Sequence, residues 1–273
     1  MFLLLSLAGC PPRVDVRTTP APDATALLAE VDAVDAQVAR LQSQAKARID
    51  ARGKKGNVQL FVAVAAPASV HLEVLDFFGK PSGILVSDGH RFVLFTSEAA
   101  VWQRGAATAE NVARVLPVSL PPAQLVSMLL GRAPRLEDPA PTLAPDPEEN
   151  LWRVSLHAGA RTQQLWIDPA RKRVLRSRVD GTGGYTLSFD GFEDVHGAPF
   201  PRKIAFSGPG SVALEYTDLR LGDAPDPSLF DAEPPPGAPV EPLGAGPPAR
   251  RLPGPTSPPA RGPDAPVTGS QAG

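Results

Sequence analysis

The sequence has a single cysteine, Cys10, and only 4 histidines among its 273 residues. One cysteine cannot form an internal disulfide, and scattered histidines cannot complete a cysteine-rich zinc site. No apolar run approaches the roughly 20 residues that a membrane-spanning helix needs. The 27 Lys and Arg residues nearly balance the 29 Asp and Glu residues, so net charge gives no reason to expect a nucleic-acid partner. The composition therefore indicates a globular domain of low net charge.

Motifs of the common enzyme classes are also missing. The sequence contains no Gly-x-Ser-x-Gly, Gly-x-Gly-x-x-Gly, P-loop or His-Glu-x-x-His pattern. The histidines stand singly at predicted strand or turn positions: His71, His90, His157 and His196. Solvated turns explain the acidic group at Asp190, Glu193 and Asp194 and the basic run over residues 171–173 better than acid–base chemistry does. We therefore expect neither an enzyme nor a cofactor.

Proline, in contrast, is abundant: 33 of the 273 residues are proline, which is more than twice the usual share of about 5%. Residues 234–273 hold 13 Pro and 7 Gly and few aliphatic side chains. Such a segment cannot bury enough apolar surface to offset its ordering entropy, so we predict a disordered tail there. A second proline cluster predicts a long surface loop over residues 134–148. The folded domain is therefore expected over residues 23–233.

The N-terminus carries a specific chemical pattern. Residues 1–9 are an apolar run that ends in Leu7-Ala8-Gly9, directly before Cys10. This resembles the bacterial lipobox, which implies that residues 1–9 are a signal-peptide remnant and that Cys10 receives fatty acyl groups such as palmitate. No Lys or Arg precedes the run, although secretory signals carry a positive start; a start codon placed too far downstream would account for this. Residues 10–22 are then a proline-bearing tether.

From residue 23 on, hydrophobic periodicity predicts the secondary structure. Behind Asp23, a plausible N-cap, apolar residues recur at alternating spacings of four and three up to Leu41, which predicts a helix of about five turns. From Ala45 the period changes to two, which indicates a strand. Further strands are expected over residues 58–64, 70–75, 83–87, 91–96, 101–102, 151–157, 162–168, 173–180, 184–192, 201–207 and 211–221.

Two short helices are predicted between these strands, over residues 108–116 and 119–131, with Ser119 near the second N-cap. The connections between the strands are too short for crossover helices, so the sheet is expected to be antiparallel. The predicted fold class is α+β, mainly β, with about eleven strands, one leading helix and two inserted helices.

The order of these elements and three stretches, residues 70–79, 108–134 and 189–202, resemble the LolA/LolB lipoprotein-localisation family, most closely the LolB-like outer-membrane lipoproteins. The resemblance implies a half-open curved antiparallel β-barrel with two lid helices over a hydrophobic cavity that accepts acyl chains. Small or flexible apolar side chains would line it: Ala47, Ile49, Val58, Leu60, Val62, Leu72, Val74, Val112, Leu116, Leu125, Met128 and Leu129. Alternation alone does not separate this cavity from a close-packed core of the same residues, and without the resemblance the core is the preferred interpretation.

The resemblance also implies a membrane-contacting loop. Phe78, which precedes Gly79, matches an exposed apolar position of LolB, and we expect Phe77 to fold back into the core. Lys80 would meet a lipid phosphate.

By the same resemblance, the protein is lipid-anchored on the periplasmic face of the bacterial outer membrane. It would receive lipoproteins from a periplasmic LolA-like carrier and insert them into that membrane. The alternative is a non-enzymatic structural or lipid-binding lipoprotein on the same scaffold, without transfer activity.

Overall fold

The computed structural model describes residues 14–51, 53–98, 100–195 and 197–243. Within these ranges the chain forms one 14-stranded sheet and three α-helices. The α-helices are α1 (Ala24–Asp35), α2 (Ala109–Val115) and α3 (Pro122–Leu129). The strands are β1 (Arg40–Ala51), β2 (Lys54–Ala65), β3 (Ser69–Leu75), β4 (Pro81–Ser87), β5 (Arg91–Thr96), β6 (Val101–Ala106), β7 (Thr142–Asp146), β8 (Leu151–Ala158), β9 (Arg161–Asp168), β10 (Arg173–Asp180), β11 (Tyr185–Val195), β12 (Ala198–Ser207), β13 (Ser211–Leu221) and β14 (Val240–Pro242).

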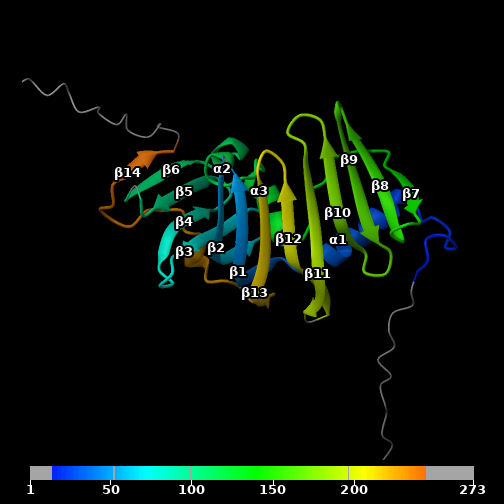
Figure 1. Cartoon of the computed structure of the whole chain (residues 1–273), viewed down its shortest axis with the longest axis horizontal. Coiled ribbons are helices and arrows are strands. Elements are labelled where there is room, and N and C mark those ends of the chain that lie inside the picture. Colours follow the sequence, from blue (N-terminus) through cyan, green and yellow to red (C-terminus); the bar gives the residue numbers. More distant parts are fainter. Residues whose placement is uncertain (1–13, 52, 99, 196, 244–273) are drawn as a thin grey trace, which may run out of the picture.

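Across the sheet the strands follow the order β14-β6-β5-β4-β3-β2-β1-β13-β12-β11-β10-β9-β8-β7. Strands β1–β6 thus form one wing, with β14 at its outer edge, and strands β7–β13 form the other; the antiparallel pair of β1 with β13 joins them. The outermost strands, β14 and β7, do not pair with each other, so the sheet is a curved, half-open barrel with the helices on one face (Figure 1). The predicted architecture is confirmed, with 14 strands in place of about eleven.

Helix α1 begins where the sequence predicted. The Asp23 side chain caps it by accepting a hydrogen bond from the backbone N–H of Ala26 at 2.9 Å. The helix ends at Asp35, so the prediction of about five turns was wrong. Leu41 fits both the helical spacing and the alternation of β1, and the pairing of β1 with β2, which starts at Arg40, fixes it in the strand.

The predicted proline-rich loop also contains regular structure. Strand β7 lies within residues 134–148 and pairs with β8 at the edge of the sheet. Pro145 is tolerated in it because an edge strand leaves one side of its backbone without ladder hydrogen bonds. The loop is therefore shorter than predicted.

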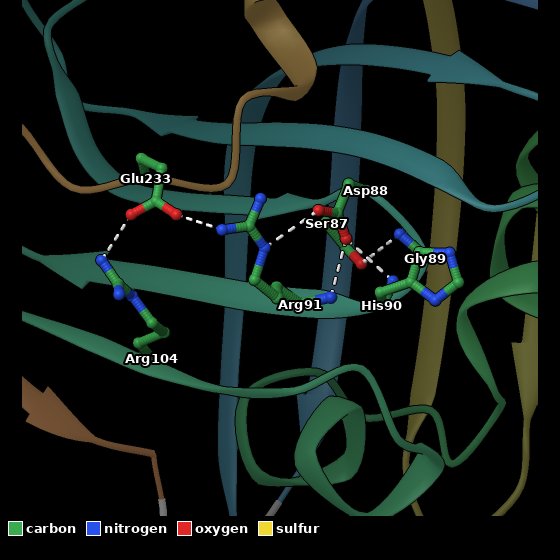
Figure 2. Close-up of polar contacts among 7 residues, drawn as sticks. All are labelled: Ser87, Asp88, Gly89, His90, Arg91, Arg104 and Glu233. Atoms are coloured by element: carbon green, nitrogen blue, oxygen red, sulfur yellow. Dashed lines mark hydrogen bonds and ion pairs between the residues drawn. The ribbon is translucent and has the colours of Figure 1, made fainter.

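The last described residues form a segment that we name the C-terminal strap, residues 226–243, on the outer face of β3–β6. Ala232 is 1% exposed and packs against Val86 and Val93. The Glu233 carboxylate accepts hydrogen bonds from both Arg91 and Arg104, as Figure 2 shows. Strand β14 then pairs in parallel with β6, so the strap covers both the face and the edge of this wing.

The predicted disordered tail therefore starts too early. Residues 234–243 belong to the strap, whereas residues 244–273 lie outside the described residues, as do residues 1–13 with Cys10. The strap packs on this wing because β4 and β5 carry continuous apolar runs, Ile84–Val86 and Phe92–Phe95. The side chains of these runs point to both faces of the sheet. The outer face of these strands needs a cover, and the strap supplies it.

A buried ion pair ties α1 to the second wing. The Arg173 side chain is 1% exposed; its Nη1 lies 2.6 Å from Asp35 Oδ1, and its Nη2 donates to the carbonyl oxygen of Gly131 at 2.8 Å. Burial raises the pKa of Asp35 to about 6, against the opposing effect of Arg173 and Arg132. The expectation of a solvated basic turn was thus wrong for Arg173, although Arg171 is half exposed.

Candidate functional site

A hydrophobic cavity of about 530 Å³ lies between the helical pair α2–α3 and the concave face of the sheet. Its volume falls within the roughly 300–1,000 Å³ that small-molecule sites occupy. The strands contribute Ala47, Ile49, Ala51, Leu60, Leu72, Val74, Gly83, Ile84, Leu85, Leu94, Phe95, Thr96, Ile204, Phe206, Val212 and Leu214 to its wall. The helical pair and its link contribute Arg114, Leu116, Pro117, Val118, Leu125, Met128 and Leu129.

The helical pair is fixed over the sheet by caps and by one buried hydrogen bond. Thr108 caps α2 by accepting a bond from the backbone N–H of Asn111 at 3.2 Å. Helix α3 begins after Pro121, later than the predicted cap at Ser119, because proline suits the first turn. At its other end the buried Tyr216 hydroxyl donates to the carbonyl oxygen of Leu129 at 2.7 Å, and burial raises the pKa of Tyr216. The lid is thus anchored to β13.

Partial exposure of apolar side chains separates a cavity from a close-packed core. The lining residues Ile49, Val74, Leu94, Leu116 and Val212 are half-buried, although a packed interior would enclose them fully. The wall also includes residues with small side chains, Ala47 and Ala51, and glycine at position 83 contributes no side chain at all. The structure therefore favours the cavity over the solid core.

Nine of the twelve residues that the sequence analysis assigned to the cavity stand at its wall. They are Ala47, Ile49, Leu60, Leu72, Val74, Leu116, Leu125, Met128 and Leu129. The other three lie elsewhere: Val62 and Val112 are fully buried in the core beneath the wall, and Val58 is half-buried against that core.

The sequence analysis missed the contributions of β4, β5, β12 and β13. The positions of β12 and β13 depend on pairing between distant parts of the chain, such as Ala47 with Leu214 and Ile49 with Val212. Strands β4 and β5, in contrast, continue the series of hairpins after β3. Alternation in residues 211–221 indicated an inward face, and that face would have supplied candidates once the strand was placed beside β1.

The loop between β3 and β4, residues 76–80, is a tight turn that we name the Phe loop. Asp76 closes it: its backbone N–H donates to the carbonyl oxygen of Lys80, and its Oδ1 accepts from the N–H groups of Phe78 and Lys80, each at 2.8 Å. Gly79 has φ +75°, which favours glycine. Phe77 is 97% exposed and Phe78 is 82% exposed, so the expectation that Phe77 folds into the core was wrong.

The Phe loop lies next to the wall of the cavity. Val74 and Gly83, which flank the loop in the chain and pair across β3 and β4, both stand at the cavity wall. The loop, drawn in cyan in Figure 1, projects away from the body of the sheet. Two aromatic rings in edge-to-face contact, with centroids 5.5 Å apart, are therefore presented to solvent near the cavity. Lys80 is exposed in the same turn.

Metal-binding clusters and membrane-spanning helices were also considered for the part of the chain that the structure describes. There, no group of three or more His, Cys, Asp or Glu side chains is arranged to hold a metal ion. No described helix has the length and apolarity needed to cross a membrane. Of the histidines in these ranges, His71 is buried. Its Nδ1 lies 2.6 Å from the carbonyl oxygen of Leu229 in the strap, and its Nε2 lies 2.7 Å from Glu73 Oε1.

Comparison with solved structures identifies the fold. A LolA-superfamily protein of Nitrosomonas europaea matches with a TM-score of 0.52 at 16% identity, covering 77% of this chain and 98% of its own. An outer-membrane lipoprotein-sorting protein domain of Vibrio parahaemolyticus matches at 0.50 and 11%, covering 76% and 95%. A DUF1329-family protein of Desulfovibrio piger matches at 0.53 and 12%, covering 76% and 95%. No protein-family model and no curated protein matches the sequence. The fold is LolA/LolB-like, as the sequence resemblance implied.

Proposed function

We propose that this LolA/LolB-like domain binds the acyl chains of lipoproteins in its hydrophobic cavity and delivers them to the outer membrane. The observation that carries the proposal is the row of half-buried aliphatic side chains around a cavity of about 530 Å³ beneath α2 and α3. Each methylene that leaves water for such a surface gains about 0.8 kcal/mol, so a chain of ten carbons gains roughly 8 kcal/mol before ordering costs. No covalent step is needed, so the proposal includes no enzyme activity and no cofactor.

The Phe loop supports delivery to a membrane. Its two phenylalanines can enter the acyl boundary of a bilayer while Lys80 meets lipid phosphate, which would hold the cavity near the receiving leaflet. Acylation of Cys10, which lies outside the described residues, would anchor the protein on the periplasmic face of the outer membrane. A LolA-like periplasmic carrier would supply the lipoproteins. Similarity to the outer-membrane lipoprotein-sorting domain of Vibrio parahaemolyticus supports an envelope location.

Filling the cavity at Gly83 should abolish acyl binding without unfolding the domain. A Cβ at this position would meet its nearest atoms, in Phe95 and Val74, at 3.6 and 3.7 Å, which is ordinary contact. We expect Gly83→Phe to place its ring in the cavity and to weaken binding of a fluorescent fatty acid at least tenfold. The measurement is a titration of the full-length chain carrying Cys10→Ala, which has no acyl group of its own.

Gly83→Ala is the matched control, because it adds a Cβ and leaves the cavity empty; we expect it to bind like the parent chain. If Gly83→Phe folds with an unchanged melting temperature and binds the fatty acid as well as Gly83→Ala does, the cavity is not the acyl site. A second assay separates binding from delivery: carrier loaded with radiolabelled lipoprotein is mixed with liposomes and the domain. Acyl binding without lipoprotein movement into the liposomes would favour the lipid-binding alternative.

A further inference from the structure

One charged side chain stands in the wall of the hydrophobic cavity. Among the described residues that line it, Arg114 is the only one with an ionisable group, and Thr96 is the only one with a hydroxyl. The Arg114 side chain is 45% exposed, so this residue of the wall is also in contact with water. A bound chain whose hydrocarbon end fills the apolar interior would leave its polar end at this water-exposed part of the wall.

Arg114 is oriented by an acidic partner on the same helix. Its Nη2 donates to Glu110 Oε1 at 2.9 Å, one turn earlier in α2. Glu110 is 78% exposed and does not line the cavity. Exposed ion pairs of this spacing contribute little to stability, because solvent screens them and side-chain freedom is lost. The contact with Glu110 can therefore yield to a competing anion.

We propose that Arg114 gives the cavity a second class of ligand besides the acyl chains of lipoproteins: free acyl chains that carry an anionic head group. The inference rests on the proposed function, because it requires that the cavity binds acyl chains. A guanidinium offers five N–H donors in a planar fork and binds a carboxylate or a phosphate through two parallel hydrogen bonds. A neutral head group gains neither the charge nor the second bond. The anion can be the carboxylate of a fatty acid or the phosphate of a phospholipid.

Three ligands with the same chain distinguish these sources: dodecanoate, dodecyl phosphate and dodecanol. Each displaces a fluorescent fatty acid from the full-length chain carrying Cys10→Ala, at low ionic strength and pH 8. We expect at least one of the anions to bind about three- to thirtyfold more tightly than dodecanol, the range of a charge-assisted bond at a half-exposed site. Whichever anion shows the gain identifies the source.

Variants of the pair test the assignment to Arg114. Arg114→Gln should remove the preference for the anions over dodecanol, because it removes the charge and the planar pair of donors. Glu110→Gln should move affinity in the opposite direction and strengthen anion binding about two- to fivefold, because it removes the competing carboxylate. A role of Arg114 in folding alone would not produce opposite effects from the two partners.

Equal affinities for all three ligands in the parent chain, or an anion preference that persists in Arg114→Gln, would overturn the inference while acyl binding stands. Failure of dodecanol and both anions to displace the probe would instead overturn the proposed function. The melting temperatures of both variants should match that of the parent chain, because α2 exposes both side chains.

Discussion

Glutamate at both Phe77 and Phe78 is expected to weaken binding of the chain to phospholipid vesicles by about a hundredfold or more and to leave the melting temperature unchanged. The two side chains are 97% and 82% exposed and contact each other at the tip of a closed turn, so the fold loses no buried surface. Burying one phenylalanine side chain in an apolar phase is worth roughly 1.5–3 kcal/mol, which is about ten- to a hundredfold in partitioning.

Vesicle flotation of the full-length chain carrying Cys10→Ala measures this effect without the contribution of a lipid anchor. Phe77→Leu with Phe78→Leu is the matched control, because it keeps the loop apolar and should retain most of the binding. Val240→Glu, at another exposed apolar side chain, tests for a general effect of added charge. Unchanged flotation of the glutamate variant would show that the Phe loop does not contact the membrane.

Replacing Arg173 by methionine is expected to lower the free energy of unfolding by about 3–5 kcal/mol at pH 8, the usual cost of removing one partner of a buried ion pair. Methionine preserves much of the side-chain length, so the loss reports mainly the charge and its hydrogen bonds. Asp35 would stay buried without its closest cation, and the carbonyl oxygen of Gly131 would lose its donor. Chemical denaturation measures the effect.

The pH dependence of this loss follows from Asp35. Its folded pKa, about 6, already lies above the ordinary aspartate value of 3.8 because of burial, and removal of Arg173 raises it further. A carboxyl with a raised folded pKa opposes folding as pH rises through that value, so the loss should be smaller at pH 5 than at pH 8. Arg171→Met, two residues earlier at a half-exposed pair with Asp168, should cost at most about 1 kcal/mol. Equal small losses for both arginines would contradict burial of the Arg173–Asp35 pair.

The regular part of the fold could be predicted from local pattern. In β1 the buried Leu41, Ala45 and Ala47 alternate with the exposed Gln44 and Lys46, and period two needs no information about partners. Local pattern failed where one residue fits two periods. Leu41 continues both the helix and the strand, and only its pairing with Val64 on β2 decides between them.

On the sheet, the sequence predicted the candidate site only along β1, β2 and β3. Strands β4 and β5 continue the same series of hairpins, but their contributions were missed. Leu60 and Leu72 lie on the two strands of one hairpin, β2 and β3, and hairpin register follows from the turn. Ile204 and Leu214 reach the same cavity from strands that close the sheet across the middle, and such pairing leaves no short-range signal. The sequence also contains a signal for the strap: Ile84–Val86 is apolar on both faces, which indicates that the outer face is covered. The proline-rich composition of the segment after residue 233 pointed instead to a disordered tail.

The most direct test of acyl binding is a crystal structure of the chain carrying Cys10→Ala with 12-bromododecanoate, located by the anomalous scattering of bromine. We expect the bromine in the apolar interior, near Leu72 and Met128, and the carboxylate near Arg114. A bromine peak outside the wall defined by α2, α3 and the concave sheet would contradict acyl binding in this cavity. So would a structure in which Ile49, Leu94 and Leu116 close on one another and leave no cavity.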